Sequence, residues 1–201
     1  MQVLFVCTGN LCRSPVAERL AAAWAREALG DSPELAQVEV LSAGVEADAG
    51  QTIAPSSAQA LRQLGGDPED FGSRPLTAEL ADGADLVLAM TRDHRREVLK
   101  LAPRGLRRTF TLTEAADLVT QADLRGLRTL PLTPRAQELG RRLDAVRAYR
   151  SPTANDDIPD PIRQRPAVHE EVARTIAAAL RPLADVLFTS VRDQPALRVP
   201  A

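Results

Sequence analysis

Long apolar runs, cysteines and aromatic residues are all scarce in this chain of 201 residues. No run of eighteen apolar residues occurs and no basic start precedes an apolar stretch, so we expect a cytoplasmic protein without membrane association. The two cysteines, Cys7 and Cys12, lie in one loop, which excludes a disulfide scaffold. A net charge of -2 predicts no general affinity for nucleic acid.

The length predicts one domain, and the alternation of strands and helices predicts its architecture. Apolar runs indicate strands, and helical spacing of apolar residues separates them; the runs lie at 3–6, 38–41, 84–91 and 107–112. No hairpin signal joins two strands, so right-handed crossovers are expected. We therefore predict an α/β fold, a single three-layer domain with a four-stranded parallel sheet and helices on both faces. A ligand site then belongs at the carboxyl ends of the strands.

One stretch carries the chemistry: residues 6–15 read Val-Cys-Thr-Gly-Asn-Leu-Cys-Arg-Ser-Pro, between the first strand and the first helical pattern. The backbone N–H groups of residues 8–13 can wrap around an anion, with Gly9 permitting the sharp curvature. Arg13 supplies a planar fork of donors that matches two oxygens of a tetrahedral oxyanion. Cys7, at the end of the strand, is then placed beneath that oxyanion.

The residues after the loop predict a helix start and the state of the thiol. Ser14 suits the N-cap, and Pro15 suits the first helical position. The helix N-terminus adds partial positive charge, which together with Arg13 and the converging amides favours the thiolate form of Cys7. A thiolate beneath a phosphate is a nucleophile aimed at phosphorus. We also expect Ser14 to donate a hydrogen bond to the sulfur.

The string Cys-Thr-Gly-Asn-Leu-Cys-Arg-Ser-Pro closely resembles the signature of the low-molecular-weight protein tyrosine phosphatase family, whose fold a class of arsenate reductases shares. The resemblance covers residues 1 to about 118 and 155–190. It implies that Cys7 and Arg13 are catalytic and that Ser42, in a Ser-Ala-Gly segment, supports the loop. The loop residues that it implies in phosphate binding are Thr8, Gly9, Asn10, Leu11, Cys12 and Ser14.

A general acid is predicted in the segment Asp157-Ile158-Pro159-Asp160-Pro161. Departure of a phenolate needs a proton, which a carboxylic acid above the phosphate supplies. Proline after Asp160 biases that residue toward extended backbone. The resemblance implies the same residue, because the family's acid lies in an Asp-Pro pair before the final helix. Asp157 is the alternative.

Three departures from the family pattern bear on the substrate. Phe71 occupies the place of a histidine that normally orients the loop asparagine, so Asn10 is expected to be held differently. Ile162 and Arg163 follow Asp-Pro where tyrosines usually wall the substrate pocket. Residues 46–48 also lack the aromatic often found there. A phosphotyrosine ring would lose these stacking partners.

The resemblance predicts hydrolysis of phosphotyrosine in a phosphorylated protein, through a cysteinyl-phosphate intermediate and without metal or cofactor. We expect a monomer or weak dimer that binds no nucleic acid. Three alternatives stay open: an arsenate reductase that uses an external thiol, a phosphoarginine phosphatase and a non-catalytic phosphate-binding protein. Arginine-directed members tend to carry Thr where this chain has Leu11, which favours an aryl phosphate.

The remaining predictions concern the edges of the site. Residues 120–154 form an insertion with one helix whose basic face, including Arg135 and Arg150, is solvated or docks an acidic partner. Residues 1–191 form the domain, and residues 192–201 form a flexible tail. His94 is expected on a helix surface.

A reversible Cys7–Cys12 disulfide would protect Cys7 from over-oxidation, and mass spectrometry after peroxide treatment tests it.

Overall fold

The computed structural model of the chain describes residues 1–150 and 156–189. Its centre is a sheet of four strands in the order β2-β1-β3-β4, and each neighbouring pair is parallel. The strands are β1 (Gln2–Cys7), β2 (Glu39–Gly44), β3 (Leu86–Ala89) and β4 (Thr109–Thr111). The predicted four-stranded parallel sheet is confirmed, and β2 extends to include the Ser-Ala-Gly segment that we placed after it.

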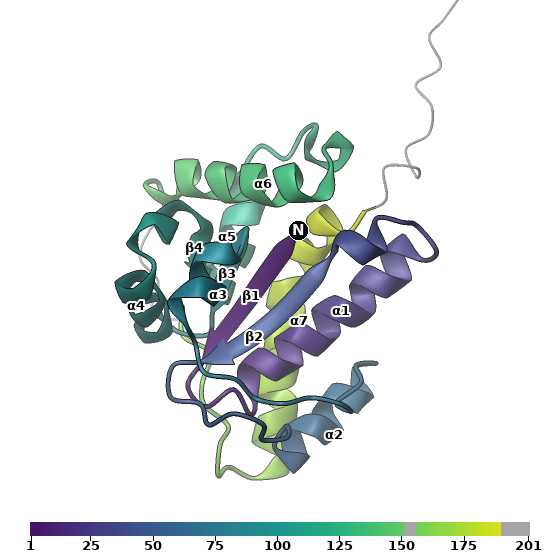
Figure 1. The fold of residues 1–201 in the computed structure, drawn as a ribbon, viewed down its shortest axis with the longest axis vertical. Helices are drawn as coiled ribbons and strands as arrows, with labels where there is room; N and C mark the ends of the chain where they lie inside the picture. The colour runs from purple at the N-terminus through teal and green to yellow at the C-terminus, as the bar shows by residue number, and fades with distance from the viewer. Residues whose placement is uncertain (151–155, 190–201) are drawn as a thin grey trace, which may run out of the picture.

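Helices cover both faces of the sheet (Figure 1). They are α1 (Arg13–Leu29), α2 (Pro55–Gln63), α3 (Ala78–Gly83), α4 (Arg92–Leu101), α5 (Leu112–Gln121), α6 (Leu132–Arg147) and α7 (Pro166–Leu187). Short 3-10 helices lie at η1 (Leu35–Gln37), η2 (Pro103–Arg108) and η3 (Leu127–Thr129). The larger apolar cluster joins the sheet to α1, α5, α6 and α7, and the smaller joins it to α3 and α4. This is the predicted three-layer arrangement.

Strand β1 positions the loop because it is buried on both sides. Val3 and Phe5 enter the larger cluster, whereas Leu4 and Val6 enter the smaller one. Side chains alternate along a strand, so a continuous apolar run suits a central parallel strand. β1 lies between β2 and β3, and Cys7 is paired in register with Gly44 at the carboxyl edge.

Threonine side chains start two helices at this same edge. The Thr91 hydroxyl accepts from the His94 amide at the start of α4. Thr111 forms a capping box with Glu114 at the start of α5. The prediction for α1 was wrong: the helix begins at Arg13, without a side-chain cap, and Ser14 turns its hydroxyl toward Cys7 instead.

Helix α6 packs one face against the core and exposes the other. Its apolar residues, Leu132, Ala136, Leu139 and Leu143, are buried. The predicted basic face is wrong for Arg135, which is 0% exposed and donates to the carbonyls of Arg128, Leu130, Leu187 and Thr189. The guanidinium thus satisfies carbonyls at the carboxyl end of α7, where a helix leaves them unpaired. Burial lowers the pKa of Arg135.

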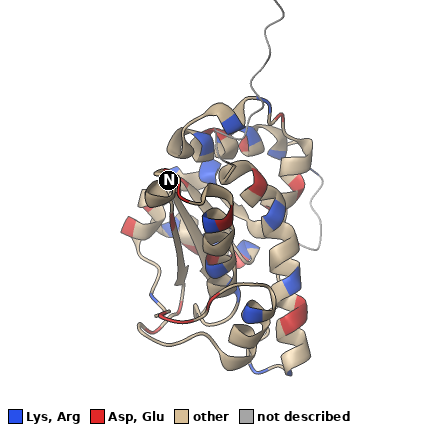
Figure 2. Ribbon diagram, turned by 90° about the vertical axis from the view of Figure 1, so that its right-hand side faces the viewer, with Lys and Arg blue, Asp and Glu red and all other residues tan. Residues whose placement is uncertain are grey.

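The structure does not describe all of the predicted insertion, or the predicted C-terminal tail. Residues 151–155, within the predicted insertion, and the predicted tail 192–201 lie outside the described residues, so both boundaries stay predictions. Within the described residues no helix is long and apolar enough to cross a membrane. Figure 2 shows acidic and basic positions interspersed along the helices that face the viewer.

Candidate active site

The loop between β1 and α1 turns at Asn10 rather than at Gly9. Asn10 has a φ of 54°, in the left-handed region that asparagine tolerates, whereas a side chain at Gly9 would meet only Leu11 at 3.8 Å. The glycine that the loop requires is Gly44, because a Cβ there would overlap the Thr8 carbonyl oxygen and the Asn10 nitrogen. The sequence analysis did not identify this close approach at Gly44.

The loop contains backbone and side-chain N–H donors that have no partner within the described residues. Within the described part of the chain, the backbone amides of residues 8–12 donate to no carbonyl or side chain. Arg13 is 4% exposed, and its Nε has no hydrogen-bond partner among the described residues. An unpaired buried donor is costly, and an anion that accepts from several such groups would relieve that cost. The arrangement therefore suits a tetrahedral oxyanion.

Arg13 also joins the loop to the predicted acid. Its NH2 donates to Asp160 Oδ2 at 2.7 Å and to Thr8 Oγ1 at 3.2 Å, and its NH1 donates to the Ile158 carbonyl at 3.1 Å. A cavity of about 160 Å³ opens here, lined by Cys7, Thr8, Gly9, Leu11, Cys12, Arg13, Asp160 and Ile162. The structure thus brings the predicted nucleophile, arginine and acid to one cavity.

A chain of buried hydrogen bonds leads from Cys7 to a carboxylate. Cys7 Sγ lies 3.0 Å from Ser14 Oγ. Asn10 Nδ2 donates to Ser14 Oγ at 2.9 Å and to Ser42 Oγ at 2.7 Å, and Ser42 donates to Glu18. Ser14 accepts from Asn10, and its one hydroxyl proton faces both the sulfur at 3.0 Å and the more distant Ala43 carbonyl oxygen at 3.5 Å. These contacts fix the Ser14 hydroxyl beside the sulfur and connect it through Asn10 and Ser42 to Glu18.

The same contacts show how Asn10 is held without the histidine. Its Oδ1 accepts from the Arg74 amide at 2.9 Å, while Ser14 and Ser42 accept from its Nδ2. Phe71 is buried in the apolar core and takes no part in these hydrogen bonds. Burial raises the pKa of Glu18, and the hydrogen bond from Ser42 opposes that rise. The Ser14–Glu18 spacing of one helical turn was the sequence signal that could have placed Glu18 here.

Cys12 differs from Cys7 in its surroundings. Both thiols are free and buried. Burial raises the pKa of the Cys12 thiol to about 11, against a smaller lowering by its hydrogen bond with Ser57. Ser57 Oγ in turn lies 2.8 Å from His169 Nδ1 on α7. Cys12 is therefore a neutral thiol at pH 7, which makes it a poor nucleophile.

His94 is a site residue that sequence reasoning missed. It was expected on a helix surface, but it is 6% exposed and packs behind the loop. Its Nε2 lies 2.9 Å from Thr8 Oγ1, and its Nδ1 lies 2.9 Å from Thr91 Oγ1. Its place in the first turn of a helix that begins at the carboxyl edge of the sheet was the available signal. Burial, and then the nearby Arg13 cation, lower the pKa of His94 to about 4.

The lowered pKa of His94 predicts a loss of stability in mild acid. The unfolded chain binds this proton near pH 6.5, whereas the folded chain binds it near pH 4. The unfolded state then holds more protons between these values, so the free energy of unfolding should fall as the pH drops from 6.5 to 4, by up to about 3 kcal/mol. Urea unfolding at several pH values should show a shallower pH dependence in His94→Gln. Equal slopes in both proteins would contradict the prediction.

The segment after residue 155 holds its three aspartates in different places. Asp156 pairs with Arg150 at 2.6 Å and Asp157 with Arg92 at 3.2 Å, so only Asp160 of the three lines the cavity. The Ile158 amide donates to the Met90 carbonyl at 2.8 Å, which fixes the segment against the end of β3. The alternative acid, Asp157, is therefore held by Arg92 and does not line the cavity with Cys7.

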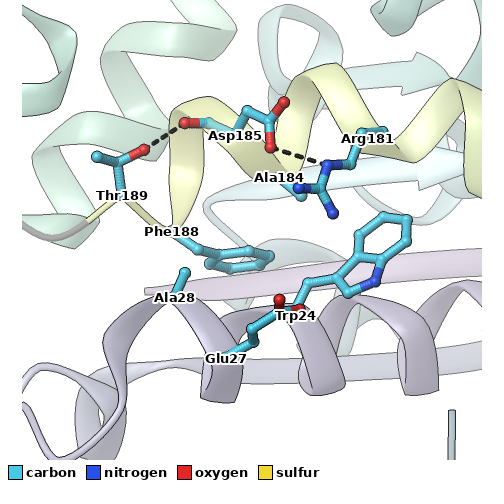
Figure 3. Close-up of a pocket in the computed structure, with 8 residues that line it drawn as sticks. All are labelled: Trp24, Glu27, Ala28, Arg181, Ala184, Asp185, Phe188 and Thr189. Atoms are coloured by element: carbon cyan, nitrogen blue, oxygen red, sulfur yellow. Dashed lines mark hydrogen bonds and ion pairs between the residues drawn. The ribbon is translucent and has the colours of Figure 1, made fainter. Parts of the chain in front are cut away.

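A second pocket lies between α1 and α7, at the opposite end of the sheet (Figure 3). Figure 3 shows Arg181 above the Trp24 ring, 5.2 Å from its centroid, and paired with Asp185 at 3.0 Å. Phe188 forms the floor near Ala28. The pocket faces the amino ends of the strands and contains none of the predicted site residues. Trp24 is half-buried here and packs against the larger apolar cluster.

Comparison with known proteins agrees with the loop and the fold. The family model described as low molecular weight phosphotyrosine protein phosphatase matches residues 2–126. A protein-arginine-phosphatase of Bacillus subtilis is 42% identical over 115 residues, 57% of this chain and 71% of the relative. The low molecular weight protein-tyrosine-phosphatase Etp of Escherichia coli is 38% identical over 101 residues, 50% of this chain and 62% of the relative.

A solved structure shares the architecture. The low molecular weight protein tyrosine phosphatase from T. tengcongensis has a TM-score of 0.66 and 28% identity, and the match covers 92% of this chain and 98% of that one. The family model spans well over half of the chain and includes β1, the loop and α1. This chain therefore belongs to the low molecular weight phosphotyrosine protein phosphatase family.

Proposed function

We propose that this protein is a cysteine-dependent phosphatase that hydrolyses phosphotyrosine in proteins through a cysteinyl-phosphate intermediate. The observation that carries the proposal is the convergence at one cavity of Cys7, the unpaired Nε of Arg13 and the carboxylate of Asp160. The available loop amides complete a cradle for three phosphate oxygens. Family membership supports the same reaction class.

The proposed reaction has two steps. The loop amides and Arg13 hold the phosphate, the Cys7 thiolate attacks phosphorus, and Asp160 gives its proton to the leaving oxygen as the P–O bond breaks. Asp160, now a carboxylate, then takes a proton from water, which attacks phosphorus and expels the Cys7 thiolate. Ser14 donates a hydrogen bond to the sulfur, which stabilises the thiolate as leaving group. Arg13 must exchange its contact with Asp160 for the phosphate, so substrate binding frees the acid.

The cavity wall supports an aryl phosphate. Leu11 and Ile162 line the cavity with aliphatic groups, and Asp160 is the one carboxylate among its lining residues. A phenyl ring packs against such walls without leaving polar groups unpaired, whereas a guanidinium would bury several donors there. Ile162 takes the place of the tyrosines expected in the family, so contact with aliphatic carbon replaces ring stacking.

A phosphoarginine phosphatase is the second candidate. The observation in its favour is the 42% identity to the Bacillus subtilis protein-arginine-phosphatase. Arsenate reduction has less support, because a relay within the chain needs further thiols and the chain has two cysteines in all. That reading would need an external thiol. A non-catalytic phosphate-binding protein would have no need of Asp160 at the cavity.

The test is a comparison of substrates with the reduced protein in EDTA. We expect hydrolysis of p-nitrophenyl phosphate, and a kcat/KM for a phosphotyrosine peptide at least about 10-fold above that for a phosphoarginine peptide of the same sequence. The reverse order would transfer the proposal to phosphoarginine. Phosphate binding without hydrolysis would favour the non-catalytic reading, and arsenite production from arsenate and glutathione alone would favour the reductase.

The other sequence expectations stay part of the proposal. They are a phosphorylated protein as partner, a monomer or weak dimer, a cytoplasmic location, and the reversible Cys7–Cys12 disulfide. Both cysteines line the same cavity, which supports the disulfide. The raised pKa of Cys12 implies that its thiol must lose a proton before it can attack an oxidised Cys7.

A further inference from the structure

The segment that holds Asp160 is fastened by an arginine from outside the region that the family model matches. Arg150 follows the end of α6, beyond residue 126, where the match ends. Its guanidinium grips Asp156 with two donors, NH2 to Oδ1 at 2.6 Å and NH1 to Oδ2 at 2.9 Å. Its Nε donates to Asp117 Oδ2 on α5 at 2.5 Å. One side chain thus connects α6, α5 and the start of the acid segment.

The Arg150–Asp156 pair has the features of a firm contact. The side chains of Arg150 and Asp156 are 9% and 11% exposed, so salt screens their attraction less than that of surface pairs. A bidentate guanidinium–carboxylate contact fixes direction as well as distance. The hydrogen bonds with Asp156, opposed by partial burial, raise the pKa of Arg150. The Asp156 carbonyl also accepts from Thr113 Oγ1 at 2.8 Å.

The fastening acts close to the catalytic groups. Two residues past Asp156, Ile158 is buried, and its carbonyl accepts from NH1 of Arg13. Two residues further, Asp160 accepts from NH2 of the same arginine. A shift of Asp156 would therefore move both contacts of Arg13. Displacement of a catalytic group by about 1 Å can cost about 100-fold in rate, so such a brace has kinetic consequences.

We propose that Arg150 is a positioning residue for proton transfer, and that the α6 segment braces the Asp160 segment over Cys7. The proposal rests on the phosphatase reaction proposed above. Without Arg150, the Asp156 and Asp117 carboxylates lose the guanidinium that donates to both of them. The segment then moves away from α5, and Asp160 no longer stays at the leaving oxygen.

Substrates with leaving groups of different basicity distinguish a positioning role of Arg150 in proton transfer from a general loss of activity. Phenyl phosphate needs the acid's proton, whereas p-nitrophenyl phosphate has a stable leaving anion and needs it less. In Arg150→Met we expect kcat/KM for phenyl phosphate to fall by about 10-fold or more, with a change of less than about 3-fold for p-nitrophenyl phosphate. Arg141→Met, an exposed arginine on α6 that pairs with Glu138, is the matched control and should change neither.

Two further variants keep the test decisive. If Arg150→Met does not fold, Arg150→Lys retains the charge without the three-donor fork and should show the same substrate split in smaller degree. In an Asp160→Asn background, Arg150→Met should lower kcat/KM for phenyl phosphate little further, because the acid that Arg150 positions is already absent. Equal losses on both substrates, or full additivity with Asp160→Asn, would overturn the positioning role.

Hydrogen exchange tests the brace without any activity. The Ile158 amide, bonded to the Met90 carbonyl, should exchange at least about 10-fold faster in Arg150→Met and unchanged in Arg141→Met. Unchanged protection in Arg150→Met would refute the brace even if the wild-type chain hydrolysed no phosphate ester. Faster exchange with an inactive wild type would instead support the brace and count against the proposed function.

Discussion

Replacement of Cys7 by serine is expected to abolish turnover, with kcat lower by at least about 10⁴-fold, while phosphate still binds. A serine hydroxyl needs a base to become a nucleophile, and the hydrogen-bonding side chain beside Cys7 is the Ser14 hydroxyl, which is not basic. The amides of the loop and Arg13 do not depend on the sulfur. Hydrolysis of p-nitrophenyl phosphate measures the loss of turnover, and isothermal titration with inorganic phosphate measures the binding that remains.

Alkylation of the wild-type protein identifies the reacting thiol independently. Iodoacetate at neutral pH should modify Cys7 rapidly and spare Cys12, because burial raises the pKa of Cys12 to about 11. Inorganic phosphate should slow the modification, since both would occupy the cavity that Cys7 lines. Faster modification of Cys12, or turnover that survives in Cys7→Ser, would show that another group attacks phosphorus.

Replacement of Asp160 by asparagine should lower kcat/KM for phenyl phosphate by about 10²–10⁴-fold, with a much smaller loss for p-nitrophenyl phosphate. Asparagine keeps the shape of the side chain but has no acidic proton to give. Phosphate binding should stay or become tighter, because Arg13 no longer has to leave the carboxylate at 2.7 Å before it grips the oxyanion. Steady-state kinetics over a series of aryl phosphates and phosphate titration measure these effects.

Asp157→Asn is the matched control for the acid. It lies three residues away in the same segment, but it pairs with Arg92 on α4 rather than with Arg13. We expect kcat/KM to change by only about a few-fold, and to the same extent for phenyl phosphate and p-nitrophenyl phosphate. If Asp157→Asn showed the substrate split and Asp160→Asn did not, the roles of the two carboxylates would have to be exchanged.

Sequence patterns predicted correctly those features that depend on residues close together in the chain. The apolar run of β1 and the strand-loop-helix of residues 6–15 each depend on neighbours within a few positions. Such patterns carry their own structural consequences, since burial, capping and turn chemistry follow from residue type and spacing. The placement of Asp160 at the cavity followed from the family resemblance, and the structure agrees with it.

Polar residues on amphipathic helices marked the limit of that reasoning. Arg135 and His94 were expected at helix surfaces because their side chains are polar, yet both are buried. Each lies four residues before a buried apolar residue of the same helix, Leu139 and Val98. Arg135 finds its partners at the end of α7, 52 and 54 positions along the chain, and His94 finds Thr8 at a separation of 86. Periodicity describes which side of a helix is apolar, but it does not say which polar side chains meet carbonyls or hydroxyls from distant elements.

The sequence by itself determined the chemistry of this protein: a thiol, an arginine and a loop of amides at the end of a buried parallel strand. Only the tertiary structure decided how those groups are held. It turned the loop at Asn10, connected Cys7 to Glu18 through Ser14, Asn10 and Ser42, and placed Arg150 on the acid segment. The reason is that Cys7, Arg13 and the loop amides lie within one local motif, whereas several of the groups that hold them come from elements that only the packed fold brings together.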